Sequence, residues 1–300
     1  MSRSRYRSDR GLIARMGLTM FLLGLLLVIL GAVLVAYFSY WGLVFLAIFL
    51  GAQWFFSDRL ALYGMGGRIV TPEEAPELHG IVDRLCAIAD MPKPKVAIAD
   101  TDLPNAFATG RSQDHAVVCA TTGIMRRLDE RELEGVLAHE LSHVAHRDVT
   151  VMTIASFVGV LAGFLTRMVL WSGMGGRRNN NNNNGTPVVL VVLLVSIVVY
   201  ALSFLLTRTL SRYRELAADR AGAYLTGQPS SLASALTKIS GEMGRIPARD
   251  LRQAEAFNAF FFAPAIAKGF SLSSLFSTHP SLEKRLDQLG RISADLSRPS

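Results

Sequence analysis

The longest uncharged run of the chain, residues 16–57, limits its possible folds more than any other feature. Its 42 residues are enough for two membrane-crossing helices, because each needs about 20 predominantly apolar residues. Residues 37–42 supply aromatic side chains typical of a membrane interface, so we predict a tight turn there. A cleaved signal peptide would have one shorter apolar core, which this run does not match.

Two more apolar segments, residues 149–172 and 187–206, predict a third and a fourth transmembrane helix. Arg167 interrupts the first near its end, where a long cationic side chain can extend to the interface. Residues 173–186, which include six consecutive asparagines, are interpreted as a solvated external loop. Half of the residues are hydrophobic and mean hydropathy is positive, so we expect a mostly α, multi-pass membrane protein.

The distribution of positive charge predicts how the chain is oriented. The net charge is +7, and the arm formed by residues 1–15 contains five arginines. The positive-inside rule places this arm in the cytoplasm, and four spans then return both termini to that side of the cell membrane. Arg177 and Arg178 in the external loop oppose this orientation. Because no basic module interleaved with aromatic residues occurs, nucleic-acid binding is not predicted.

The two polar segments, residues 58–148 and 207–300, predict one cytoplasmic α+β domain built from both sides of the last two spans. We expect a helix over residues 72–90 and strands over residues 95–100 and 115–122. Between the two strands, residues 104–110 are expected to form a short strand or turn. Residues 230–300 are predicted to be helical, with a helix over 281–289. The apolar segment 258–263 fits a core or a membrane contact.

Cys86 and Cys119 form no CxxC pattern. They fit a reducing compartment, where such residues are usually small, buried and apolar in character.

The pattern His139-Glu140-x-x-His143 indicates a catalytic metal site. Residues four apart lie on one face of a helix, so both imidazoles can bind a single Zn²⁺ ion that needs one more protein ligand and keeps a position for water. Glu140 can then accept a proton from that water. The alternative is a surface histidine pair on an amphipathic helix. Against it, four apolar residues form a stripe on the opposite face: Leu133, Leu137, Leu141 and Val144.

The best candidate for the third ligand is Glu215. Asp219 follows it by four residues, so on a helix both point the same way, and Asp219 can hydrogen-bond a ligand histidine. The alternative is a helix-surface acid among arginines. Two predicted spans separate His143 from Glu215. His143 lies about six residues before the first of these spans, and Glu215 lies about nine residues after the second. An even number of spans returns both residues to the same membrane surface, which favours the shared site.

The motifs together resemble HtpX-type membrane zinc metallopeptidases, which are related to the CAAX prenyl endopeptidases and have a gluzincin ligand set. The likeness is carried by residues 105–110, 139–148, 215–220 and 277–281. It implies a zinc endopeptidase with one Zn²⁺ per subunit, the ligands His139, His143 and Glu215, and Glu140 as general base. It also implies polypeptide substrates, above all unfolded or damaged membrane proteins, and a role in quality control.

The resemblance implies further roles near the site. Asn105 would begin an edge strand that pairs with the substrate backbone, and His279 or Arg220 would steady the oxyanion. Structural capping is the alternative for Asn105 and His279. For His146 and Asp148 we expect helix-ending or ligand-supporting roles. The asparagine tract lies outside the family pattern.

Two other functions fit parts of the sequence. A membrane scaffold or chaperone with a structural metal would need a closed coordination sphere, whereas three ligands and a poised glutamate are present. A transporter with a regulatory zinc would be expected to carry paired charges within its spans, and the predicted spans have none. The sequence predicts no oligomeric state.

Overall fold

The computed structural model describes residues 10–64, 66–110, 112–175, 185–243 and 279–298 of the 300-residue chain. The asparagine tract, Arg177, Arg178 and the apolar segment 258–263 lie outside the described residues.

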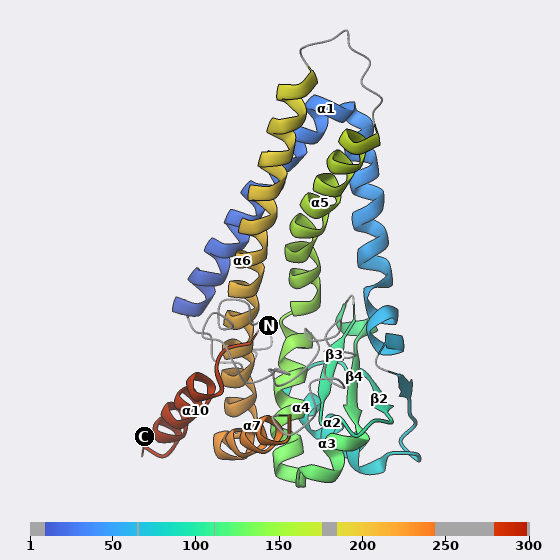
Figure 1. The fold of residues 1–300 in the computed structure, drawn as a ribbon. Coiled ribbons are helices and arrows are strands. Elements are labelled where there is room, and N and C mark those ends of the chain that lie inside the picture. Colours follow the sequence, from blue (N-terminus) through green and yellow to red (C-terminus); the bar gives the residue numbers. More distant parts are fainter. Residues whose placement is uncertain (1–9, 65, 111, 176–184, 244–278, 299–300) are drawn as a thin grey trace.

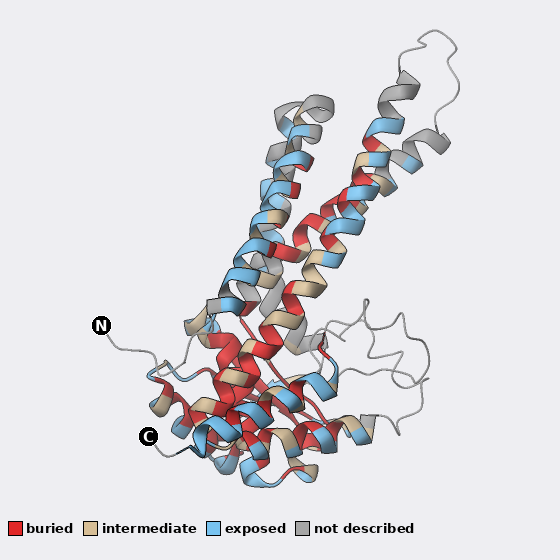
Figure 2. Cartoon of the chain, turned by 90° about the vertical axis from the view of Figure 1, so that its left-hand side faces the viewer, coloured by how far each residue is buried: buried red, intermediate tan, exposed pale blue. Residues whose placement is uncertain are grey.

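Three long helices form one end of the molecule: α1 (Arg10–Gly64), α5 (Asp148–Gly175) and α6 (Gly185–Thr226). They extend away from a small sheet domain, and α1 reverses direction at the far end before returning to the sheet (Figure 1). Buried residues gather in the sheet domain and on the facing sides of these helices, while their outer sides are exposed (Figure 2). Exposed outer residues include Phe21, Val28, Leu190 and Leu194, as expected for helices surrounded by lipid.

Among the described residues, two helical stretches are long and apolar enough to cross a membrane, Ala14–Ala32 and Leu190–Thr226. Ala155–Arg167 is a shorter apolar helix. The number of spans therefore stays a prediction. The helical assignment of α1 continues through residues 37–42, where we expected a turn. Likewise α6 continues past residue 206 into the segment that carries Glu215, so the fourth apolar segment and the third candidate ligand share one helix.

The sheet has four described strands in the order β1-β2-β4-β3: Gly67–Ile69, Lys95–Ala99, Val117–Thr121 and Ala106–Thr109. β2 and β4 are parallel, and the two outer pairs are antiparallel. The segment predicted as a short strand or turn is therefore β3, at the edge of the sheet. This edge faces α4 (Figure 1).

Helices cover the rest of this domain: α2 (Pro76–Ala89), the 3₁₀ turn η1 (Gln113–His115), α3 (Thr122–Arg127), α4 (Glu130–Ala145), α7 (Pro229–Met243) and α10 (Leu282–Leu296). Four apolar residues of α2 are buried: Leu78, Ile81, Val82 and Leu85. The four apolar residues of the α4 stripe are buried too. One apolar core joins α2, α4, α7, α10 and the sheet.

α4 begins at Glu130, directly after its N-cap residue Asp129. Asp129 accepts a hydrogen bond from the Glu132 N–H, and the Glu132 carboxylate accepts one from the Asp129 N–H, which is a capping box. Two glycines let neighbouring helices approach closely. A Cβ on Gly222 of α6 would lie 3.0 Å from the His139 backbone nitrogen, and one on Gly135 would lie 3.2 Å from that of Leu232. The first glycine thus lets α6 lie close against the motif helix, and the second lets α7 do so.

Candidate metal centre

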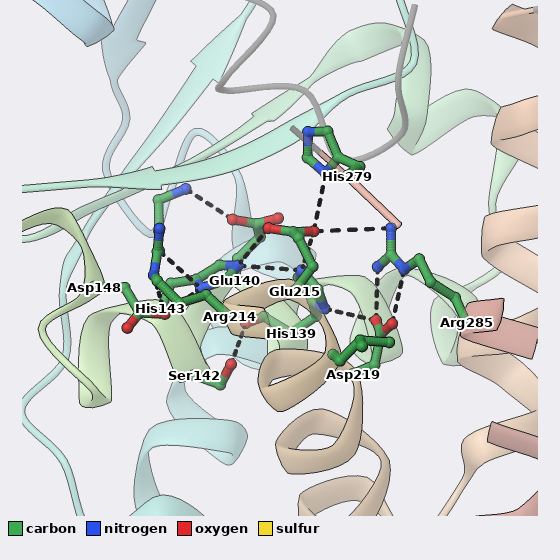
Figure 3. Close-up of polar contacts among 12 residues, drawn as sticks. His139, Glu140, Ser142, His143, Asp148, Arg214, Glu215, Asp219, His279 and Arg285 are labelled. Atoms are coloured by element: carbon green, nitrogen blue, oxygen red, sulfur yellow. Dashed lines mark hydrogen bonds and ion pairs between the residues drawn. The ribbon is translucent and has the colours of Figure 1, made fainter. Parts of the chain in front are cut away.

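Side chains from two helices that are far apart in the sequence converge on one point. His139 and His143 project from α4, and Glu215 projects from α6 (Figure 3). One ligand atom from each lies within 4.8 Å of the other two. The two Nε2 atoms are 3.2 Å apart, Glu215 Oε2 lies 3.6 Å from His139 Nε2, and Glu215 Oε1 lies 3.4 Å from His143 Nε2. All three residues are buried.

These separations fit a zinc ion. Zn–N and Zn–O bonds of about 2.0–2.2 Å in a tetrahedral arrangement place neighbouring ligand atoms about 3.3–3.5 Å apart. The three distances between the candidate ligands, 3.2, 3.6 and 3.4 Å, lie close to that value. Two imidazoles and one carboxylate are also a donor set that suits zinc. The residues therefore fit the ion that the motif predicts.

Each histidine is held by an aspartate on its other ring nitrogen. His139 Nδ1 lies 2.9 Å from Asp219 Oδ1, and His143 Nδ1 lies 2.7 Å from Asp148 Oδ2. A proton on Nδ1 that is donated to a carboxylate leaves the Nε2 lone pair available for a metal. The predicted contact between Asp219 and a candidate ligand is thus present, and Asp148 supports the other ligand.

The contacts with carboxylates also determine the direction in which the pKa values of the two histidines shift. Burial lowers the pKa of His143, but Asp148 and Glu215 outweigh it and raise that pKa to about 10. Burial also opposes protonation of His139, and its contacts with Asp219 and Glu215 again raise the pKa overall. Three carboxylates thus provide a negative environment suited to a cation.

Glu140 lies beside the convergent ligands and contacts the sheet edge. Its Oε2 accepts a hydrogen bond of 3.0 Å from the backbone N–H of Ala108 in β3. Burial raises the pKa of Glu140, and the neighbouring imidazoles partly offset that effect. A carboxylate with a raised pKa is suited to accept a proton and to return it near neutral pH.

Comparisons with known proteins identify the family. The model of "Peptidase family M48" matches residues 72–293, which include both parts of the site. The chain belongs to peptidase family M48. It is 61% identical over 296 residues to "Protease HtpX homolog 1" of Streptomyces coelicolor, covering 98% of this chain and 96% of that protein. It is 56% identical over 299 residues to "Protease HtpX homolog" of Moorella thermoacetica, with 98% of each covered. The predicted HtpX-type resemblance is confirmed.

The M48 chain also shares its fold with a solved structure, the crystal structure of Ste24p from S. mikatae. The TM-score is 0.53 at 17% identity. The likeness covers 89% of this chain and 62% of the other, less than two thirds of that protein's length.

The structure places the other predicted residues of this M48 peptidase as follows. His279 Nδ1 lies 3.1 Å from Glu215 Oε2, so this histidine is beside the site. Asn105 is fully buried, and its backbone N–H donates to Thr121 Oγ1 at the start of β3. Arg220 stacks its guanidinium over the Tyr224 ring, 5.1 Å from the centroid. His146 ends α4, where its backbone N–H donates to Ser142.

Two arginines near the site were not among the predicted residues. Arg285 of α10 donates to both carboxylate oxygens of Asp219, at 2.7 and 2.6 Å, and lies 3.9 Å from Glu215. Arg214 of α6 lies 3.1 Å from Asp148. A sequence signal exists for Arg285, because it interrupts the buried stripe that α10 forms with Leu289 and Ile292.

Proposed function

We propose that this M48 peptidase is a zinc-dependent endopeptidase that works at a membrane, with one Zn²⁺ held by His139, His143 and Glu215. The observation that carries the proposal is the convergence of one ligand atom from each of the three residues to within 4.8 Å of one another, with Glu140 beside them. When bound, zinc would polarise a scissile carbonyl and lower the pKa of a water molecule. Glu140 would accept the proton of that water and deliver it to the leaving amine.

The outer edge of β3, which pairs with no other described strand, supports binding of an extended peptide. In an antiparallel pair, alternate residues direct their backbone groups away from the neighbouring strand. Asn105 pairs with Thr121 of β4 through its backbone, so the backbone groups of Ala106 and Ala108 point outward. The Ala108 N–H points away from β4, since it donates a hydrogen bond to Glu140 of α4. A substrate strand added at this edge would lie beside the general base.

Positively polarised groups flank the proposed reaction centre. His279 and Arg285 lie 3.1 and 3.9 Å from Glu215. We propose that His279 helps to stabilise the charge that develops on the scissile carbonyl oxygen. Arg285 instead holds Asp219, and through it His139. Asn105 would position the edge strand rather than touch the reacting atoms, because its backbone N–H ties the start of β3 to Thr121 Oγ1.

We also propose that the three long helices cross the cell membrane as four spans, with residues 58–148 and 207–300 and both termini in the cytoplasm. The exposed apolar sides of α1 and α6 support insertion, because soluble proteins rarely expose large contiguous apolar surfaces. A peptide-binding edge at the base of these helices suits unfolded or damaged membrane proteins as substrates, and a role in quality control.

Degradation of an unfolded protein tests this function. The purified full chain in detergent should cleave casein when zinc is present, and a chelator should abolish cleavage. Glu140→Gln should retain zinc yet cleave about 10²–10⁴-fold more slowly, because the general base is lost. Glu134→Gln is the matched control, since Glu134 lies on the same helix and pairs with Arg84 away from the site. Near-normal cleavage by Glu140→Gln would contradict the proposal.

A further inference from the structure

A second cavity lies outside the metal centre, between α5 and α6. Its volume is about 470 Å³, and only these two helices line it. The helices run antiparallel (Figure 1), and the Thr207 hydroxyl donates to the Ala155 carbonyl between them. Small-molecule sites have volumes of about 300–1,000 Å³, so the cavity is large enough for part of a ligand.

Two glycines bring α5 and α6 into close contact beside this cavity. A Cβ on Gly159 would lie 3.1 Å from the Ser203 hydroxyl, and one on Gly163 would lie 3.4 Å from the Tyr200 ring. The helices therefore meet along a glycine face, and the longer side chains stand to the side of the contact. Val160 and Phe164 are half-exposed and line the cavity.

Arg208 provides a cation at one end of the cavity. It is the first charged residue of α6, after 23 uncharged residues from Gly185 to Thr207. Those residues form about 34 Å of helix, slightly more than the roughly 30 Å hydrocarbon core of a bilayer. The guanidinium therefore lies where the hydrocarbon ends, on the side of the sheet domain.

The polar contacts of Arg208 leave it available for an anion. Its guanidinium carbon lies 3.8 Å from the Phe204 ring centroid. Its Nε is buried and has no hydrogen-bond partner among the described residues. No described carboxylate pairs with it. The Thr207 and Ser211 side chains line the same end of the cavity and add hydroxyl groups beside the cation.

We propose that this cavity binds one anionic phospholipid, with its phosphate on Arg208 and an acyl chain along the groove lined by Met152, Val160 and Phe164. Basic pockets between transmembrane helices at the cytoplasmic surface suit anionic headgroups, and arginine suits phosphate. A substrate helix fits poorly. A helix about 10 Å across fills 470 Å³ in only about one turn.

The inference rests on the membrane insertion included in the proposed function, but not on peptidase chemistry. It is therefore tested by binding, in chelator-treated protein that cannot cleave. If the cavity binds no lipid tightly, casein cleavage should still be observed. If the chain does not cleave casein, tight lipid binding should still be observed.

The experiment counts lipids bound to the delipidated full chain in detergent by native mass spectrometry. Dioleoyl phosphatidylglycerol should bind with one tight equivalent, and dioleoyl phosphatidylcholine about tenfold more weakly, because only the first has a net negative headgroup. Arg208→Gln should weaken phosphatidylglycerol binding about tenfold. Arg212→Gln is the matched control. It removes the same charge one turn further along α6, outside the cavity lining, and should leave the tight equivalent intact.

A second variant keeps every charge and fills the groove. Val160→Trp should remove the tight equivalent, and the half-exposed position of Val160 lets the larger side chain be added without disturbing the core.

Equal losses in Arg208→Gln and Arg212→Gln would show a non-specific basic surface and overturn the proposal. Displacement of the lipid by millimolar inorganic phosphate would reduce the site to a phosphate site and also overturn it. Val160-dependent binding of a leucine-alanine transmembrane peptide, without a tight lipid, would identify a helix as the occupant instead.

Discussion

The two histidines of the metal centre have the same kind of support, but the supports differ in strength. His139 contacts Asp219, which receives two hydrogen bonds from Arg285. His143 contacts Asp148, which lies 3.1 Å from Arg214. On the first side the three side chains are between 0% and 2% exposed, and on the second between 5% and 10%.

The difference shows what each support joins together. The Arg285 side ties α4, α6 and α10, so the last described helix is attached to the site through a buried charge pair. Arg285 is the less replaceable residue, because a guanidinium can donate to both oxygens of a carboxylate at once. The Arg214 side ties α4 to the start of α5 and to α6. It therefore couples the ligand helix to the long apolar helices through contacts that are slightly less completely buried.

The largest expected effect comes from Asp219→Asn. Loss of the carboxylate leaves the Arg285 guanidinium buried without its charge partner, which costs about 3–5 kcal/mol of stability. Zinc affinity should fall about 10–100-fold, because His139 loses its orienting acceptor. Thermal unfolding and chelator competition measure the two effects.

The control for that variant is Asp287→Asn on α10. Asp287 pairs with Arg291 at an exposed position, and its loss should change stability by less than about 1 kcal/mol. Equal destabilisation by the two variants would contradict the larger contribution to stability that we assign to the buried pair of Asp219 and Arg285.

A smaller effect is expected from Asp148→Asn. Zinc affinity should fall about tenfold, since His143 loses its carboxylate acceptor. The stability cost should be about 2 kcal/mol, because the Arg214 side chain is 10% exposed, against 2% for Arg285, and is therefore less completely desolvated. The same two measurements apply, and a larger loss here than in Asp219→Asn would reverse the comparison.

Conservative replacement of the arginines sharpens the contrast. Arg285→Lys should lose one of its two charged hydrogen bonds to Asp219 and about 1.5 kcal/mol of stability. Arg214→Lys should cost about 1 kcal/mol, since an ammonium group can keep the contact with Asp148 but cannot also reach His143 Nδ1, which lies 3.4 Å from Arg214 Nη2. Denaturant unfolding of both variants in parallel measures the difference. Equal costs would mean that the two-oxygen geometry contributes nothing.

The smallest effect is expected at Glu132, which anchors the start of α4 away from both supports. Lys238 and Ser234 hold its carboxylate. Burial opposes ionisation of Glu132, but these partners outweigh it and lower its pKa. A lowered pKa in the folded state stabilises the protein above the unfolded value of about 4.3, and this contribution is lost as pH falls through the folded pKa.

The wild type should therefore lose more thermal stability than Glu132→Gln as the pH falls from about 4.3 to below the folded pKa of Glu132, because only the wild type has this carboxylate. A parallel decline in the two proteins would contradict this assignment.

The motifs were predictable from the sequence because their geometry is local. The spacing of His139 and His143 fixes one helical face, and Asp129 with Glu132 forms a capping box within four residues. Glu215 required a longer argument from the number of intervening spans. Arg285 and Arg214 could not be predicted in their roles, because their partners lie 66 residues away in both cases. The apolar segment 187–206 indicated a span but not that α6 continues past it as one helix to Thr226, because backbone hydrogen bonding does not depend on side-chain polarity.

Zinc content of the purified chain tests the central claim most directly, because the claim is that α4 and α6 share one ion. The wild type should contain one zinc per chain, and Glu215→Ala should contain almost none. Glu283→Ala, which removes an exposed glutamate of α10, should match the wild type. A Glu215→Ala protein that is folded and fully loaded with zinc would contradict the account.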